Sequence, residues 1–201
     1  MRVRTGWMAA LALLCAVPRA VAQTPATPDT PDQTVRAFLV ALNAQRWTEA
    51  AAFLSDAEVR PLRDLTLAWA LARLEEMRDP TSDFYAMALP GRVDSVRLKR
   101  FAGRPVTMRG VSTLGEAAAL EPREFVARLM EMARPGTHRY MGVAVENDSV
   151  AHADVREVKQ DHGVDQEAEV LELRREAGRW YVVPNTKLFF RASLLDVPDR
   201  G

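Results

Sequence analysis

The sequence predicts an α+β protein in which N-terminal helices pack on an antiparallel sheet near the C-terminus. Two observations and one physical argument support this class. Apolar residues recur at helical spacing in the first half of the chain and again before residue 134. Residues 139–184 instead alternate between apolar and polar side chains over four segments, which short turns join. A sheet of this kind has an apolar face that water does not tolerate, so we expect the upstream helices to cover it.

Four extended segments make up the predicted sheet: residues 139–146, 149–158, 166–175 and 179–184. Asn147 and Asp148 separate the first two, and this pair tolerates the backbone conformations of a tight hairpin. Gly163 lies in the second, polar junction. Gly178 lies in the third, where glycine can adopt positive φ. These segments are therefore expected to form an antiparallel meander.

The first predicted helix covers residues 31–44. Thr30 is a typical N-cap, Pro31 suits the first helical position and Gln33 completes a capping box. The apolar residues that follow give the helix one continuous apolar face: Val35, Phe38, Leu39 and Leu42.

A short second helix is predicted over residues 48–54. A third begins at Ser55 or Asp56 and ends near Met77. Pro61 lies too deep in this third helix for an undisturbed start, so we expect a break or a restart there. The apolar side chains that follow it span a wide arc, which predicts a well-buried helix.

Residues 81–119 hold several prolines and glycines between short apolar clusters. We expect one short strand or helix there, within a rim or a lid. Pro122 then begins a predicted amphipathic helix over residues 122–133. After the sheet, a last apolar cluster is expected to dock on the body of the protein: Phe189, Phe190, Leu194 and Leu195.

The N-terminus has the order of a secretory signal. Arg2 and Arg4 precede an apolar run over residues 7–17, and the small residues 20–22 form a cleavage motif before Gln23. The apolar run is too short and too rich in alanine to predict a membrane span. We therefore expect cleavage before Gln23 and an exported protein, either periplasmic or secreted.

The remaining chain is expected to form a flexible tether over residues 23–30 and a single domain over residues 31–201. The tether has repeated proline and no large apolar side chain. Cys15 is the only cysteine, so the exported chain cannot form a disulfide within itself. Its hydrophobic core must then supply the stability.

Charge and motif content exclude several functions. Residues 1–22 hold three arginines and no acid, so their removal from 27 basic and 27 acidic side chains leaves a net charge of −3. We therefore expect no nucleic-acid partner and, after signal cleavage, no membrane partner. The sequence has no glycine-rich phosphate loop, serine nucleophile elbow or exported thiol nucleophile. No cofactor is predicted.

Two stretches carry a family resemblance. Residues 35–54 read as a helix, a turn with Trp47 and a short alanine-rich helix. Residues 169–183 read as a strand, a glycine turn and a second strand that begins near Trp180. Together they resemble the nuclear transport factor 2-like superfamily, which includes ketosteroid isomerase-like and polyketide cyclase-like proteins. The resemblance covers most of residues 31–187 and implies a cone of helices against a curved antiparallel sheet. Residues 81–119 depart from that pattern because they are longer and richer in proline and glycine.

The superfamily resemblance also bears on partners. Its members often pair through the outer face of the sheet, which implies a homodimer. The same cone serves enzymes, ligand carriers and interaction modules, so membership alone gives no function.

His152 and Asp154 are the sharpest candidate catalytic pair. Two residues apart on a predicted strand, they point to the same face. A histidine oriented by a carboxylate is a usual base in acid–base catalysis, and in the resembled enzymes such groups line the cavity. Val150, Arg156 and Val158 share this face, however. That mixture equally suits a solvated or dimer-facing surface on which Asp154 pairs with Arg156.

Three aromatic residues are candidate ligand contacts. Tyr140 and Tyr181 could donate hydrogen bonds to a ligand oxygen, and Trp69 could contact an apolar ligand. The structural alternative for all three is packing within the fold. Three further polar residues lie close in sequence but lack the spacing of a known metal site, so no metal is predicted: Asp161, His162 and Asp165.

Two functions compete on these grounds. The favoured one is an exported, non-catalytic domain that binds a small apolar ligand or a protein partner in a cone-shaped pocket. The alternative is a small hydrolase, isomerase or dehydratase that uses His152 and Asp154 as an acid–base pair. The discriminating feature is whether His152 points into an enclosed pocket or to solvent.

Overall fold

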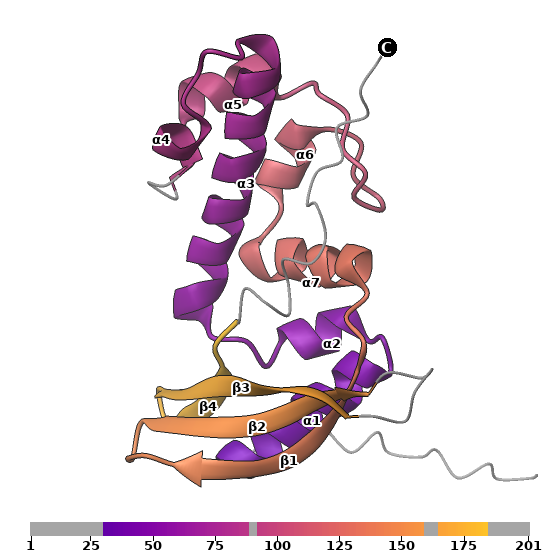
Figure 1. The fold of residues 1–201 in the computed structure, drawn as a ribbon, viewed down its shortest axis with the longest axis vertical. Coiled ribbons are helices and arrows are strands. Elements are labelled where there is room, and N and C mark those ends of the chain that lie inside the picture. The colour runs from indigo at the N-terminus through magenta and orange to yellow at the C-terminus, as the bar shows by residue number, and fades with distance from the viewer. Residues whose placement is uncertain (1–29, 89–91, 159–164, 185–201) are drawn as a thin grey trace, which may run out of the picture.

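The computed structural model describes residues 30–88, 92–158 and 165–184. The predicted signal peptide, all but the last residue of the tether and the apolar cluster from Phe189 to Leu195 lie outside these ranges. In the described ranges, helices precede strands: α1 (Pro31–Asn43), α2 (Trp47–Ala51), α3 (Asp56–Arg78), α4 (Phe84–Ala88), α5 (Ser95–Phe101), α6 (Leu114–Ala119), α7 (Pro122–Ala133), β1 (Thr137–Val145), β2 (Val150–Val158), β3 (Asp165–Glu176) and β4 (Arg179–Val182) (Figure 1). The α+β class predicted from the sequence is confirmed.

The four strands form one curled antiparallel sheet in the order β1-β2-β3-β4, so the predicted meander is confirmed (Figure 1). Pairing is regular except at two β-bulges, one on β1 between Tyr140 and Gly142 and one on β3, where Ala168 and Asp165 pair with Arg156 and Val158 of β2. A bulge increases local twist and bends the strand that carries it. The two bulges therefore account in part for the curl of the sheet.

The inner face of the sheet is apolar and packs on α1. Ala151, Ala153 and Val155 alternate along β2 with the polar residues of the outer face, and each is fully buried. Phe38 of α1 is also fully buried in the same core cluster. Burial of one such phenylalanine side chain stabilises the fold by about 2–3 kcal/mol. The contact of α1 with β1, β2 and β4 is thus the main attachment between helix and sheet.

Main-chain bonds to Val182 cover the last residue of the β4 edge and end α2 early. The amide of Val182 donates to the carbonyl of Phe53 over 2.8 Å, and the amide of Ser55 donates to the carbonyl of Val182 over 3.0 Å. Leu54 forms a parallel bridge with Val182 and Ser55 is extended, so a helix cannot continue through these residues. The predicted helix over residues 48–54 was therefore too long, since α2 ends at Ala51.

The third helix, α3, runs from Asp56 to Arg78 without interruption, so the break expected at Pro61 was wrong. A proline in this position removes the hydrogen bond to the carbonyl of Ala57. Both Pro61 and Ala57 are exposed, so water can satisfy that carbonyl and the helix continues. Beyond the proline, α3 projects away from the sheet and carries α4 and α5 near its far end (Figure 1).

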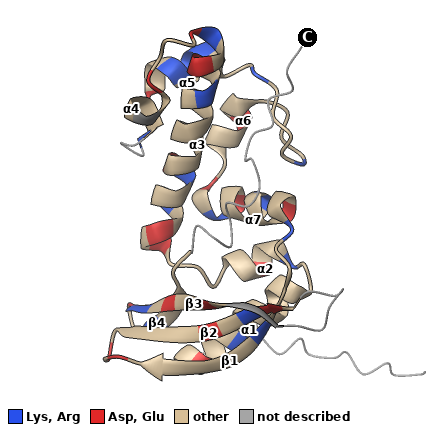
Figure 2. Ribbon diagram, viewed as in Figure 1, with Lys and Arg blue, Asp and Glu red and all other residues tan. Residues whose placement is uncertain are grey.

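The described part of residues 81–119 holds three short helices, α4, α5 and α6, where the sequence had predicted one short strand or helix. Asp94 caps α5 by accepting hydrogen bonds from the amides of Val96 and Arg97, at 2.8 and 3.1 Å. Thr113 caps α6 by accepting from the amide of Glu116. Side-chain caps thus begin helices that are too short for a clear periodic signal. Lys and Arg positions are frequent along α5, as the blue ribbon in Figure 2 shows.

Candidate interaction groove between helices α2 and α7

A surface groove of about 790 Å³ lies between α2 and α7. Ala51 and Ala127 form a buried apolar floor, and the half-buried ring of Trp47 lies at the α2 side. Ala52, which also lines the groove, is exposed. Small side chains on a floor let the backbone or a side chain of a bound molecule approach closely. We refer to this feature as the α2–α7 groove.

The α7 helix supplies one wall of the groove because it is amphipathic. Glu124, Arg128 and Glu131 lie four and three residues apart, and this spacing aligns them on one face of the helix. The opposite face packs in the core through Phe125 and Leu129. Burial of that apolar face fixes the rotation of α7, and the same rotation turns the charged face towards the groove.

Charges of both signs alternate along the rim. Arg46 pairs with Glu49 at 3.3 Å on the α2 side, and Arg128 pairs with Glu124 at 3.4 Å on the α7 side. These pairs are substantially exposed, so each contributes little to stability, about 0–1 kcal/mol. Little free energy is lost when such pairs open, and their charges are available to a partner that replaces the internal contact.

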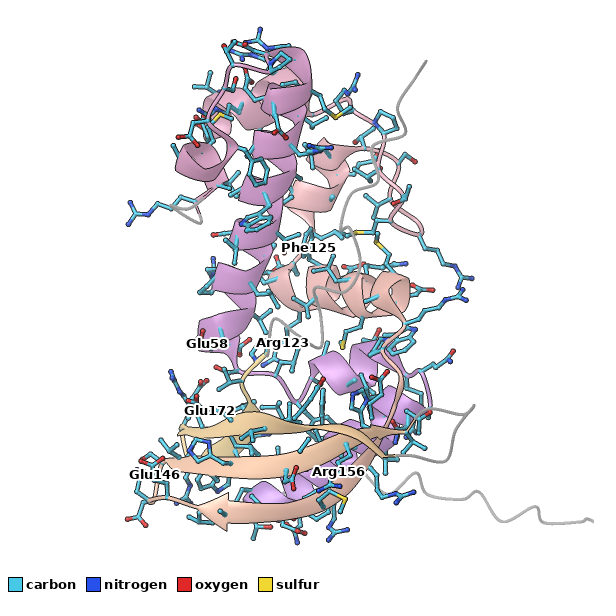
Figure 3. The ribbon with its side chains drawn as sticks, viewed as in Figure 1. Glu58, Arg123, Phe125, Glu146, Arg156 and Glu172 are labelled. Carbon is cyan, nitrogen blue, oxygen red and sulfur yellow. The ribbon has the colours of Figure 1, made fainter. Side chains whose placement is uncertain are left out.

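Arg123 joins the groove to the rest of the molecule. Its Nε donates to Asp56 over 2.8 Å, and its Nη1 donates to the carbonyl of Ala51 over 2.6 Å. The second bond satisfies a carbonyl at the C-terminal end of α2. Figure 3 shows Arg123 at the start of α7 near the base of α3, where Glu58 also lies. Arg123 therefore holds α2, α3 and α7 in a fixed arrangement.

A smaller cavity of about 220 Å³ adjoins the α2–α7 groove at Arg123. Asp56 and Arg60 of α3 line it from one side, and Glu121 and Pro122 line it from the other. Because Arg123 is a wall of both cavities, they form neighbouring depressions along one surface. An extended polypeptide could therefore contact both.

The candidate catalytic pair lies elsewhere, on the outer face of the sheet. His152 and Asp154 share that face, as predicted, because they alternate with the buried residues of β2. The Nε2 of His152 lies 2.9 Å from a carboxylate oxygen of Glu146, and the His152 side chain is 40% exposed. No hydrogen bond joins Asp154 to His152 or Arg156 in the described structure, and Oδ1 of Asp154 has no partner there. The pair is not enclosed by helices.

Tyr140 and Tyr181 lie on opposite faces of the sheet. On the inner side, the Tyr140 hydroxyl donates to Asp32, and the guanidinium of Arg36 lies 4.1 Å from the ring centre. Burial and the hydrogen bond to Asp32 raise the pKa of Tyr140 above its usual value. Tyr181 lies on the outer face, with the guanidinium of Arg179 5.1 Å from its ring centre. The fold thus separates the two predicted ligand contacts.

Trp69 lies on α3, away from both tyrosines. Its side chain is 43% exposed, and its ring meets that of Phe84 on α4 edge to face, with 5.5 Å between the ring centres. This contact holds α4 against α3. None of the three predicted aromatic contacts lines the α2–α7 groove or the cavity beside it.

The concave side of the sheet is filled by packed side chains. Ala151 and Ala153 of β2 and Leu171 and Leu173 of β3 have no accessible surface, so no space large enough for water adjoins them. They belong to one core cluster with Phe38 of α1. This close packing leaves no room for a ligand beneath the centre of the sheet.

Sequence reasoning did not single out the groove residues of α7. The helix over residues 122–133 was predicted from its apolar face, and no role was assigned to the opposite face, which carries Arg123, Glu124, Arg128 and Glu131. A regular alternation of acidic and basic residues on one helical face was the available signal. The position of α2 beside that face comes only from tertiary structure.

The described residues hold no cluster of three or more His, Cys, Asp or Glu side chains that could bind a metal ion. Asp161, His162 and the side chain of Asp165, considered from the sequence, lie outside the described structure. No described helix is both long enough and apolar enough to cross a bilayer.

The fold and groove together define an α+β protein with a curled antiparallel sheet, one helix on the concave face and further helices that carry a surface groove. No protein-family profile matches this chain, and comparisons with curated proteins and with solved structures give no match either.

Proposed function

We propose that this chain is an exported, non-catalytic interaction domain that binds a segment of a partner protein in the α2–α7 groove. The observation that carries this proposal is the composition of the groove. A floor of small apolar side chains, Ala51 and Ala127, lies beneath a rim of exposed charges of both signs. Protein interfaces combine an apolar centre with a polar rim in this way.

Packing in the concave face favours a protein partner over a small ligand in the cone. The four side chains at the centre of that face have no accessible surface, whereas the α2–α7 groove is open to solvent. The groove volume, about 790 Å³, would hold several side chains of a bound polypeptide. An apolar ligand in the cone would require the core to open.

The geometry gives the catalytic alternative little support. A base that acts on a bound substrate needs a site that orients the substrate and excludes water. His152 instead lies on an open sheet face and pairs with Glu146. Its use as a base therefore stays a prediction from the sequence.

We further propose that the fold is a divergent member of the nuclear transport factor 2-like superfamily. The curled antiparallel sheet with α1 on its concave face is compatible with that cone. Non-catalytic binding is compatible with this assignment because the superfamily includes interaction modules as well as enzymes.

The expected partner segment carries both charges around a small apolar residue. The groove presents Arg46, Arg123 and Arg128 beside Glu49, Glu124 and Glu131, so a peptide of one charge would meet repulsion along part of the rim. Exposed charge pairs contribute more to specificity than to affinity. We therefore expect a dissociation constant in the micromolar range, about −8 kcal/mol.

A displayed library of random peptides tests this proposal. Peptides selected on the full chain should bind with mixed charge and should lose at least about tenfold in affinity when Ala52→Trp fills the groove, a loss of about 1.4 kcal/mol. Ala52 is exposed, so this change leaves the core untouched. Ala119→Trp, at an exposed position of α6, is the matched control and should change affinity less than about twofold. Selected peptides that bind the Ala52→Trp variant as well as the original chain would contradict the proposal.

A further inference from the structure

The two edges of the sheet differ in how they are covered. At one edge, β4 is only four residues long, and residues 53–55 bond to the main chain of its last residue, Val182. On β1, the side chain of Asn43 covers only the start. Its amide group donates to the carbonyl of His138 over 2.8 Å and accepts from the amide of His138 over 2.9 Å. Figure 1 shows no described helix or strand beyond β1 at this edge.

The ladder between β1 and β2 shows which main-chain groups face outwards. Neighbouring pairs in an antiparallel ladder alternate between hydrogen-bonded and non-hydrogen-bonded. The amide of Glu146 donates to the carbonyl of Val150. After the bulge, the even-numbered residues of β1, Gly142 and Ala144, are therefore the ones that hydrogen-bond to β2. Val143 and Val145 therefore direct their amides and carbonyls away from β2. No hydrogen bond from another described residue reaches those groups from the outer side.

No described residue bonds to the outer side of this segment, and it lacks the devices that normally protect an edge strand. Residues 142–145 read Gly-Val-Ala-Val, with no charge and no proline. Val145 is 60% exposed, and Met141 at the bulge is 45% exposed. Edge strands that do not associate are usually shortened, charged or covered. An uncharged edge with exposed valine is suited to pairing with another strand.

We propose that a second copy of this chain pairs with the β1 edge in antiparallel orientation, about a two-fold axis at Ala144. Val143 then exchanges its outward main-chain bonds with Val145 of the partner subunit, and Val145 does so with Val143 of the partner subunit. The axis lies at the centre of the regular segment from Gly142 to Glu146, and this register gives the longest pairing that avoids the bulge. The two sheets become one continuous sheet.

Side chains fit this register on both faces. Val145, which is exposed in one copy, lies beside Val143 of the partner subunit, so pairing removes part of its apolar surface from water. Glu146 of the partner subunit lies opposite Gly142, where no atom occupies the space within 4 Å of an added Cβ. Room for the longer side chain therefore exists at the position that must accept it.

Charge complementarity favours a second copy over an unrelated strand. The hairpin after β1 carries Glu146 and Asp148, whereas the other end of β1 carries Arg139, with Arg36 of α1 stacked on Tyr140. An antiparallel two-fold pairing places the acidic end of each strand alongside the basic end of the other. Asp148 and Tyr140 are each four residues from Ala144, or about 13 Å along the strand. Opposite charges thus lie at both ends of the interface.

Sedimentation of the full chain and disulfide trapping test this proposal together. The full chain should form a dimer in the micromolar range. Facing copies of Ala144 form a non-hydrogen-bonded pair with Cα atoms about 4.5 Å apart, a distance that a disulfide can span. In a Cys15→Ser background, Ala144→Cys should therefore give a disulfide-linked dimer on mild oxidation. Ala168→Cys, exposed on the central strand β3, is the matched control and should not.

A proline at the edge tests the main-chain bonds directly. Val145→Pro removes an outward amide that β2 does not use, so the monomer should keep its fold while the dimer dissociation constant rises at least about tenfold. Val145→Thr keeps the amide and should change the constant less than about threefold. Circular dichroism of both variants checks the fold. A chain that stays monomeric at about 100 µM, or a dimer that Val145→Pro does not weaken, would overturn the proposal. A dimer without trapping at Ala144→Cys would overturn it too.

Discussion

The hydroxyl of Tyr140 on β1 donates a hydrogen bond to the carboxylate of Asp32 in the first turn of α1. The Nε of Arg36 donates to the same carboxylate over 2.8 Å. Asp32 also lies at the helix end where the dipole favours a negative charge. One carboxylate therefore receives bonds from its own helix and from the edge strand, and it attaches the start of α1 to the sheet.

This attachment predicts an acid-dependent loss of stability. The hydrogen bonds from Arg36 and from Tyr140 lower the pKa of Asp32 below its usual value in the folded protein. A depressed folded pKa contributes stability that is present above the unfolded pKa of about 3.9 and is lost as pH falls through the folded pKa. Tyr140→Phe should therefore raise the pKa of Asp32 and destabilise the fold more at pH 7 than at the acid end of that window.

Carboxylate NMR titration of Asp32 and urea unfolding at several pH values measure the two effects. Tyr181→Phe is the control, since Tyr181 lies on the outer face of the sheet and does not contact Asp32. An unchanged Asp32 pKa in the Tyr140→Phe variant would show that the hydroxyl does not stabilise the carboxylate.

Because the carboxylate of Glu75 is buried, we expect removal of its arginine partners to destabilise the fold more than removal of Glu75 itself. Glu75 is 7% exposed on α3, and Arg78 and Arg100 both donate to it. Removal of both arginines leaves a buried charge unpaired, whereas removal of Glu75 leaves two arginines that water can hydrate. We expect Arg78→Ala with Arg100→Ala to cost about 1–3 kcal/mol, and Glu75→Leu to cost less than about 1 kcal/mol.

Urea unfolding gives both free energies for the Glu75 site. Hydrogen exchange should in addition show faster exchange in α5 when Arg100 is removed, because Arg100 joins α5 to α3. Equal costs for the two changes would mean that the carboxylate is hydrated in the folded protein.

Core and surface aromatics should differ in the cost of truncation. Phe38 has no accessible surface, so Phe38→Ala should cost about 3–5 kcal/mol. Trp69 is 43% exposed and loses chiefly its contact with Phe84, so Trp69→Ala should cost less than half as much. Urea unfolding of the two variants checks the order. A larger free-energy cost for Trp69→Ala than for Phe38→Ala would contradict the exposed position of the Trp69 side chain.

The sequence predicted the long elements because their signals are local. The apolar period of α1, its cap at Thr30 and the turn at Asn147 need no information from the rest of the chain. The early end of α2 needs such information, because bonds from residues 53–55 to Val182 decide it. Only one short strand or helix was expected where α4, α5 and α6 lie, because a helix of so few residues shows too little periodicity.

Prediction of the site was limited for the same reason. The groove joins α2 to α7, and the residues of its two sides are far apart in sequence, such as Glu49 and Glu131. For β2, however, the sequence alone already indicates which face of the sheet packs on the core. Ala151, Ala153 and Val155 form the apolar set of that strand, so an alternating pattern already assigns His152 to the opposite face.

The export expected from the sequence predicts a defined N-terminus. The order of basic, apolar and small residues before Gln23 should direct cleavage at that residue. N-terminal sequencing of the chain produced in its own host is expected to begin at Gln23, in the envelope fraction or the medium. Replacement of the small residue Ala22 by Arg should leave residues 1–22 attached, since the cleavage motif needs a small side chain there. Recovery of the chain with Met1 in a membrane pellet would contradict export with cleavage.

The exposed position of His152 distinguishes the non-catalytic binding domain from the acid–base enzyme, the two functions considered from the sequence. The pair with Glu146 is exposed, so its loss should change the free energy of unfolding by less than about 0.5–1 kcal/mol. His152→Ala should also leave peptide binding in the α2–α7 groove unchanged, whereas Arg128→Glu, which reverses a charge on the groove rim, should weaken it. Isothermal titration of a selected peptide against both variants measures this difference. A His152→Ala variant that loses a host phenotype while it keeps its fold and its peptide affinity would instead point to chemistry on the outer face of the sheet.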